Sequence, residues 1–245
     1  MDPIFYYVLL VVTGLIAGFV NTLAGGGSSL TIPALMIFGM PADIANATNR
    51  VGVFLHSIVS TLGFRRENVQ IDSADSFGIV AITVIGGVCG ALIASFLPNL
   101  YLKPVLLGVM IGMALIILIK PAVVAPPKGT PVKRLKEKPA AWVGLFIAGL
   151  YGGFVHAGVG FLLIGAISGT LRYDLVRTNS FRMLCGFVFT AAALAVVMWR
   201  GQVYWLPGLI LASGRMVGGQ AGLKVCVNGG HVAISRFLFG CSGCG

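Results

Sequence analysis

The chain has 245 residues, of which 57% are hydrophobic and only 10% charged, and its mean hydropathy is +0.96. A soluble domain carries about 25% charged residues and has no interior large enough for so much apolar surface. This composition excludes a soluble globule, a disordered chain and a secreted disulfide-stabilised domain, and it indicates an all-α integral membrane protein with about seven to nine crossings. The net charge of +10 would suggest a nucleic-acid partner in a soluble protein. Six of the basic residues lie in one segment between apolar spans, however, so we expect no nucleic acid and a basic cytoplasmic loop facing anionic lipid.

Five apolar segments precede the long polar segment in the middle of the chain. Ile4–Leu23 is long enough to cross a bilayer by itself, whereas Thr31–Met40 is too short to cross unaided. The other three segments are Val51–Phe64, Ser76–Leu97 and Pro104–Ile119. We therefore expect residues 1–119 to form a first membrane unit.

The segment Lys120–Pro139 differs in composition from everything around it. It contains five of the eleven prolines, six basic residues and one acidic residue, Glu137. This composition predicts a solvated cytoplasmic linker over residues 120–139, and it places a second membrane unit at residues 140–245.

The second unit contains four apolar spans and a shorter apolar segment at its end. The four spans are Ala140–Val155, Phe161–Leu171, Phe181–Trp199 and Tyr204–Leu223. The final segment, His231–Phe239, breaks at Cys241, so we expect the last span to be shortened. Cys241 and Cys244 have C-x-x-C spacing, but they have neither a second cysteine pair nor an adjacent histidine. The sequence therefore predicts no metal site and no cofactor.

The two units resemble each other in the order of their short motifs. The matching pairs are Ala24-Gly-Gly-Gly27 with Ala157-Gly-Val-Gly160, Thr48-Asn49 with Thr178-Asn179, and Gly86-Gly87 with Gly218-Gly219. Each pair is about 130 residues apart, which indicates a duplicated unit. With the basic linker in the cytoplasm, the positive-inside rule places the corresponding loops Pro41–Asn46 and Arg172–Arg177 on opposite faces of the membrane. We therefore predict a helical bundle of two inverted repeats, each consisting of a glycine-broken hairpin and three spans.

The two glycine breaks are the first candidate for a binding site. Glycine permits sharp turns, and non-helical backbone survives at membrane depth only where protein or a watery cavity satisfies it. A helix that restarts at Ser28 or Phe161 would direct N–H groups and a partial positive charge into such a cavity, which suits an anion. The candidate residues are Gly25, Gly26, Gly27, Ser28, Ser29, Gly158 and Gly160. The alternative is close helix packing of the GxxxG kind, which we expect for Gly14-x-x-x-Gly18 and Gly86-x-x-x-Gly90.

The polar residues that follow each hairpin are the second candidate. Thr48, Asn49, Thr178 and Asn179 either cap the N-terminus of the next span or offer side-chain donors to a solute. Arg182 lies one turn beyond Asn179 and either reaches inward or extends to the membrane interface.

Arg215 is the most informative single residue, because it lies near the middle of an apolar span. No acidic residue lies within any predicted span to neutralise it, and a central arginine costs about 3 kcal/mol to insert. Arg215 must therefore face a cavity, backbone carbonyls or a substrate. His56 lies within a span and His156 beside the second glycine break, near the proposed cavity, and they serve either as hydrogen-bonded packing residues or in proton coupling.

These motifs together resemble those of the TauE/SafE sulfite exporter family. The resemblance rests on Ala24-Gly-Gly-Gly27, Pro33-x-Leu35, Ala47-Thr48 and the glycine-rich repeat after the basic linker. It extends over roughly residues 5–240, with His156-Ala-Gly-Val-Gly160 in place of a full triple glycine. It implies an inner-membrane permease with inverted repeats that moves sulfite, sulfonates or related organosulfur anions. It also implicates Gly25–Gly27 and Thr48, and more weakly Gly158, Gly160 and Thr178.

We therefore expect a multi-pass transporter in the cell membrane that carries a small anion by alternating access, not an enzyme. The alternatives are a channel-like pore for small solutes and an intramembrane hydrolase that uses Ser28 or Ser29 with His56. The hydrolase is disfavoured because the spans contain no acid to orient the histidine, and no nucleophile-elbow motif is present. The expected partners are the small anion and the bilayer. A coupling ion, either a proton or sodium, and a homo-oligomer are both compatible with the sequence.

Overall fold

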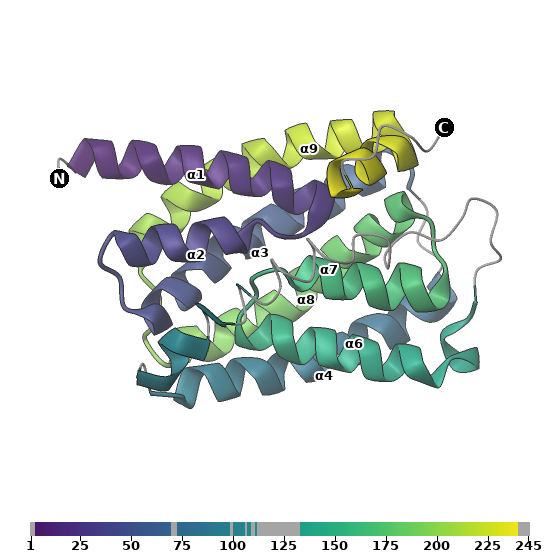
Figure 1. Ribbon diagram of the computed structural model, residues 1–245, viewed down its shortest axis with the longest axis horizontal. Coiled ribbons are helices and arrows are strands. Elements are labelled where there is room, and N and C mark those ends of the chain that lie inside the picture. Colours follow the sequence, from purple (N-terminus) through teal and green to yellow (C-terminus); the bar gives the residue numbers. More distant parts are fainter. Residues whose placement is uncertain are drawn as a thin grey trace.

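The computed structural model describes residues 3–69, 73–98, 100–105, 107–108, 111 and 133–239, and its regular elements in these ranges are all helical (Figure 1). The first half contains α1 (Pro3–Ala24), α2 (Ser28–Ile37), α3 (Ala42–Arg66) and α4 (Ser73–Phe96). The second half contains η2 (Leu135–Glu137), α6 (Pro139–Phe154), α7 (Val159–Ile164), the π-helical segment η3 (Gly165–Leu171), α8 (Leu175–Trp199) and α9 (Trp205–Phe239). The predicted all-helical fold is confirmed. Residues 112–132 lie outside the described residues, and they include most of the predicted linker 120–139 and the end of the predicted segment Pro104–Ile119.

The same order of elements occurs on both sides of the linker. A broken pair of helices, α1 with α2 or α6 with α7 and η3, comes before a long central helix and a further long helix. The central helices α3 and α8 have 25 residues each and begin at residues 42 and 175, which is a separation of 133 residues.

Helices of one repeat pack mainly against helices of the other repeat. Helix α1 packs along α9 and α6 packs along α4, so the first helix of each repeat contacts the fourth helix of the other (Figure 1). Helices α3 and α8 contact each other, and each also contacts the fourth helix of the other repeat. The central position of α3 and α8 places their side chains in the interior of the bundle.

Small residues allow the two outer helix pairs to pack closely. A Cβ atom on Gly18 would lie 2.2 Å from the Arg215 carbonyl oxygen, and a Cβ atom on Gly90 would lie 1.9 Å from the Leu150 carbonyl oxygen. The packing role predicted for Gly14-x-x-x-Gly18 and Gly86-x-x-x-Gly90 is therefore confirmed.

Three helical stretches in the described part are long and apolar enough to cross a bilayer: Phe5–Leu23, Asp75–Phe96 and Leu175–Trp199. Helix α3 is far less apolar, although it lies in the centre. Its polar side chains are buried, and they are Asn46, Thr48, Asn49, Arg50, His56, Ser57, Ser60 and Thr61. Large apolar side chains such as Phe77, Leu100 and Trp199 are exposed instead. This arrangement, with a polar interior and an apolar exterior, is what a lipid environment favours.

The end of the second repeat differs from the prediction. We expected a break between Leu223 and His231, but α9 continues as one helix of 35 residues to Phe239. In the first repeat, α4 ends at Phe96 just before Pro98, which lacks a backbone N–H and therefore interrupts the helix. The corresponding position in the second repeat is His231, which can continue the helix. The predicted shortening after Cys241 lies outside the described residues, and so do Cys241 and Cys244.

The connecting segments gather at two ends of the bundle. At one end, the Lys133 N–H donates to the Leu171 carbonyl at 2.9 Å and the Leu135 N–H donates to Asp75 Oδ2 at 3.1 Å. At the other end, Gln202 Nε2 donates to Asp43 Oδ2 at 3.4 Å. Asp43 and Arg172 belong to corresponding connections of the two repeats, so these connections lie at different ends of the bundle.

Candidate functional site

The two glycine breaks meet each other in the centre of the bundle. A Cβ atom on Gly25 would lie 2.3 Å from the Gly160 Cα atom, and one on Gly160 would lie 2.2 Å from the Gly25 Cα atom. Gly25 and Gly158 also have left-handed backbone, with φ of +85° and +74°. Glycine is therefore required at this crossing, both for the turn and for the close approach of two backbones. Helix α2 restarts at Ser28 as predicted, whereas α7 restarts at Val159, two residues before the predicted Phe161.

Arg215 is completely buried and binds side chains from the first repeat. Its Nη1 donates to Asn49 Oδ1 at 2.7 Å and to Thr31 Oγ1 at 3.2 Å, and its Nη2 donates to Ser28 Oγ at 3.4 Å. Asn49 also donates to Ser28 Oγ at 3.1 Å, and Thr31 donates to Asn49 Oδ1 at 2.6 Å. Arg215 therefore closes a network of neutral polar groups at the start of α2, which includes the predicted residues Ser28 and Asn49.

Arg182 is buried as well, so of the two predicted orientations the inward one is confirmed. Its Nε donates to Asn179 Oδ1 at 3.0 Å. Its Nη2 donates to the backbone carbonyls of Asn21 and Thr22, at the C-terminal end of α1, at 2.8 and 2.9 Å. The carbonyl end of a helix carries a partial negative charge, so these contacts stabilise the buried guanidinium.

Arg50 makes the matching contact in the other repeat, and sequence analysis did not select it. Its Nη2 donates to the carbonyls of Gly153 and Phe154, at the C-terminal end of α6. Neighbouring amides act in the same way: Asn46 donates to the Phe154 carbonyl at 2.9 Å, and Asn179 donates to the Leu23 carbonyl at 3.5 Å. We refer to these as the Asn46–Arg50 clamp and the Asn179–Arg182 clamp. The 133-residue spacing of Asn46 and Asn179 was the signal available in the sequence.

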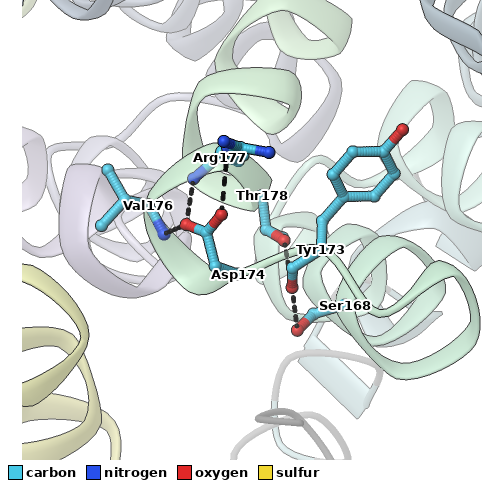
Figure 2. A network of polar contacts seen from close by, with 6 residues as sticks. All are labelled: Ser168, Tyr173, Asp174, Val176, Arg177 and Thr178. Carbon is cyan, nitrogen blue, oxygen red and sulfur yellow. Dashed lines mark hydrogen bonds and ion pairs between the residues drawn. The ribbon is translucent and has the colours of Figure 1, made fainter. Parts of the chain in front are cut away.

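Thr48 and Thr178 bond to connecting segments and not to the Arg215 network. Thr48 Oγ1 accepts from the Tyr204 N–H at 3.1 Å. Thr178 Oγ1 donates to the Tyr173 carbonyl at 3.3 Å, next to Ser168 (Figure 2). The predicted capping role is wrong for all four Thr and Asn residues, because α3 begins at Ala42 and α8 is capped by Asp174. The Asp174 carboxylate accepts from the N–H groups of Val176 and Arg177 at 3.1 and 3.0 Å, as Figure 2 shows.

The other predicted residues surround this centre. Gly26 faces the ring of Phe161, Gly27 packs on the Ala17 carbonyl, and Ser29 is half-buried in the first turn of α2. His56 is fully buried, and its Nδ1 donates to the Arg215 carbonyl at 3.1 Å. His156 has a left-handed φ of 62° and donates from Nδ1 to the Gly152 carbonyl at 3.3 Å.

The buried centre is strongly basic. Among the described residues, the one ion pair joins Arg177 and Asp174 at 3.2 Å on the exposed start of α8, away from Arg50, Arg182 and Arg215. The described residues also form no cluster of metal-ligating side chains. Three buried guanidinium groups without a carboxylate partner make this centre suitable for a negatively charged solute.

Comparison with known proteins identifies the family of the chain. The family model for the sulfite exporter TauE/SafE matches residues 10–243. The chain belongs to the TauE/SafE family.

TauE/SafE relatives include the probable membrane transporter protein YfcA of Escherichia coli K12, which is 27% identical over 97% of this chain and 87% of its own length. The probable membrane transporter protein ORF9 of a Sinorhizobium species is 27% identical over 94% of this chain and 86% of its own length. A Haemophilus influenzae probable membrane transporter protein is 25% identical over 92% and 87%. No solved structure gives a significant match. The protein is thus a member of a family of membrane transporters.

Proposed function

We propose that this protein is a secondary transporter that moves a small anion, namely sulfite, a sulfonate or a related organosulfur anion, by alternating access. The observation that carries the proposal is the group of three buried arginines around the two glycine breaks. Placing one arginine in a membrane interior costs about 3 kcal/mol, so three are retained only where they have a function or a compensating partner. An anion near mid-membrane would compensate their charge.

The anion site lies between the breaks Gly25–Ser29 and Gly158–Gly160. Ser28, Asn49 and Arg215 contribute side-chain donors from one side, and Asn179 orients Arg182 on the other. Thr48 and Thr178 contribute less directly, because their hydroxyl groups bond to connecting segments.

Alternating access arises from the two inverted repeats. The pairing of α1 with α9 and of α6 with α4 supports this proposal, because it is the same contact made twice. The two clamps hold the C-terminal ends of α6 and α1. Release of one clamp while the other holds would open the site to one face at a time.

Proton coupling is proposed for His56 and His156. Each donates from Nδ1 to a backbone carbonyl, so the neutral ring keeps a lone pair on Nε2 that can accept a proton. His56 is joined in this way to the backbone of Arg215, which links its protonation state to the position of the α9 arginine.

Replacement of Arg215 by alanine tests the transport site. We expect Arg215→Ala to abolish sulfite flux into proteoliposomes, because Ser28, Thr31 and Asn49 lose the cation that they surround. The matched control is Arg200→Ala, because Arg200 is exposed and stacks on Phe96 at 4.6 Å. Arg215→Lys keeps the charge in case the alanine variant does not insert.

Wild-type flux in inserted Arg215→Ala would contradict the role of this residue. The dependence of wild-type flux on concentration separates the two transport mechanisms, since a carrier saturates and a pore does not. The hydrolase alternative has no support in the contacts of Ser28, which bonds to Asn49 and Arg215, while His56 bonds to the Arg215 carbonyl.

A further inference from the structure

A small cavity lies where the two repeats meet, beside the crossing of the glycine breaks. Its volume is about 20 Å³, and it is bordered by α1, α3, the break before α7, and α8. Its polar lining residues are Asn21, Ser57, His156 and Arg182. Each of these side chains is more than nine-tenths buried, at 8%, 2%, 4% and 4% exposure. Two of them come from each repeat.

The Arg182 guanidinium is fixed so that one of its nitrogens remains available. Nε and Nη2 are held by Asn179 and by the end of α1, whereas Nη1 makes no hydrogen bond with the described residues. Nη1 lies 2.3 Å from the position of a Cβ atom on Gly25 and 2.5 Å from that of a Cβ atom on Gly160. Nη1 therefore occupies space that is free only because Gly25 and Gly160 have no side chains.

Arg215 differs from Arg182 in this respect. Both of its terminal nitrogens donate to neutral oxygen atoms of Ser28, Thr31 and Asn49, so it has less capacity for a further acceptor. Arg50 also has an Nη1 without a partner, but it does not line this cavity. Arg182 is thus the one of the three buried guanidinium groups that combines a free terminal nitrogen with the cavity.

We propose that this central cavity binds the head group of the transported anion, with Arg182 Nη1 as the charged donor and Asn21 and Ser57 as neutral donors. The inference rests on the proposed anion transport and assigns the contacts of the anion's head group to the Arg182 side of the site. A volume of about 20 Å³ holds roughly one water molecule, so the breaks move apart when the anion enters. Donors that converge from three helices suit a pyramidal or tetrahedral head group with three oxygen atoms better than a planar carboxylate with two.

Calorimetric titration of the purified protein in detergent tests the proposal, with methanesulfonate and acetate as probes of equal charge. We expect Arg182→Gln to weaken methanesulfonate binding by about tenfold or more, because a charge-assisted hydrogen bond is lost. Asn21→Asp should do the same without a change of shape, because its carboxylate pairs with Arg182 and repels the anion. Ser57→Ala should reduce the preference for methanesulfonate over acetate by about threefold.

Arg177→Gln is the control, since it removes an exposed arginine from the same helix and should leave affinity within about twofold of the wild type. Wild-type affinity in folded Arg182→Gln and Asn21→Asp would overturn the assignment of this cavity, and loss of binding in Arg215→Ala alone would move the site to the Arg215 network. Absence of anion binding and of flux in the wild-type protein would instead overturn the proposed function itself.

Discussion

The three buried arginines are stabilised in two different ways. Arg50 and Arg182 donate to carbonyl groups at helix ends, where the helix dipole supplies partial negative charge. Arg215 donates only to neutral side chains, and its Nε is buried without a partner, as are Nε and Nη1 of Arg50. Arg215 is therefore the one of the three whose positive charge no helix-end carbonyl compensates.

Asn49→Asp tests the importance of that uncompensated charge. Oδ1 of Asn49 lies 2.7 Å from Arg215 Nη1, so the carboxylate would form an ion pair with almost no change of shape. We expect a higher melting temperature together with an anion flux lower by about tenfold, because the local field that attracts the anion is neutralised. Asn68→Asp adds the same charge at an exposed position and should leave both quantities unchanged. Wild-type flux in Asn49→Asp would show that the charge of Arg215 does not act on the substrate.

The helices interact through two equivalent glycine-mediated interfaces. Gly153 of α6 packs on Gly87 of α4, and Gly218 of α9 packs on Leu15 of α1. A Cβ atom added to Gly153 or to Gly218 would lie 1.9 Å from the backbone carbonyl oxygen of Gly87 or Leu15, respectively. Lipid competes with apolar side chains for contact, so helices in membranes depend on such close packing and not on a hydrophobic driving force. If the α4–α6 pair and the α1–α9 pair are each rigid, one pair can move as a unit against the other.

Two alanine substitutions in α6 compare a tight and an open position. Gly153→Ala should lower the free energy of unfolding by about 1–3 kcal/mol, because its methyl group would overlap the Gly87 carbonyl. Gly144→Ala should be neutral or stabilising, since its Cβ atom would lie 3.5 Å from the Ala166 Cβ atom and alanine favours the helix by about 1 kcal/mol. Thermal unfolding in detergent measures both variants, and equal melting temperatures would argue against the interface.

In the described part of the chain, basic residues are unequally distributed between the two ends of the bundle. The end with η2 also carries Arg172, which acts with Lys138 to lower the pKa of Lys133 through charge repulsion, with Lys138 having the larger effect. Arg65 and Arg66 end α3, which runs from the opposite end, where Asp43 and Gln202 meet. By the positive-inside rule, we propose that the η2 end faces the cytoplasm.

Labelling of single cysteines tests this orientation. In a variant with the five native cysteines replaced by serine, Lys103→Cys should react with a membrane-impermeant maleimide in intact cells. Arg66→Cys should react only after permeabilisation, because its end of the bundle is the proposed cytoplasmic end. The reverse pattern would invert the proposed topology.

The sequence of the chain was sufficient to predict its membrane class, its all-helical fold, its two breaks and the inward orientation of Arg215. These properties follow from local sequence, since the length of an apolar run and the position of a glycine or a charge within it determine the solvent that the segment requires. Helix α9 was less predictable, because its continuation depends on the absence of a proline such as Pro98.

The partners of the buried donors were decided only by the tertiary structure. Arg50 and Gly153 are 103 residues apart in the chain, and Arg182 and Asn21 are 161 residues apart. A sequence motif cannot specify which carbonyl an arginine meets across such distances. The motifs matched Thr48-Asn49 with Thr178-Asn179. By their contacts, however, Asn46 is the residue that corresponds to Asn179. The sequence itself determined that polar groups lie inside the membrane, because burial follows from the sum of local transfer free energies. The fold decided which of them converge, because each hydrogen bond requires a particular distance and direction between helices.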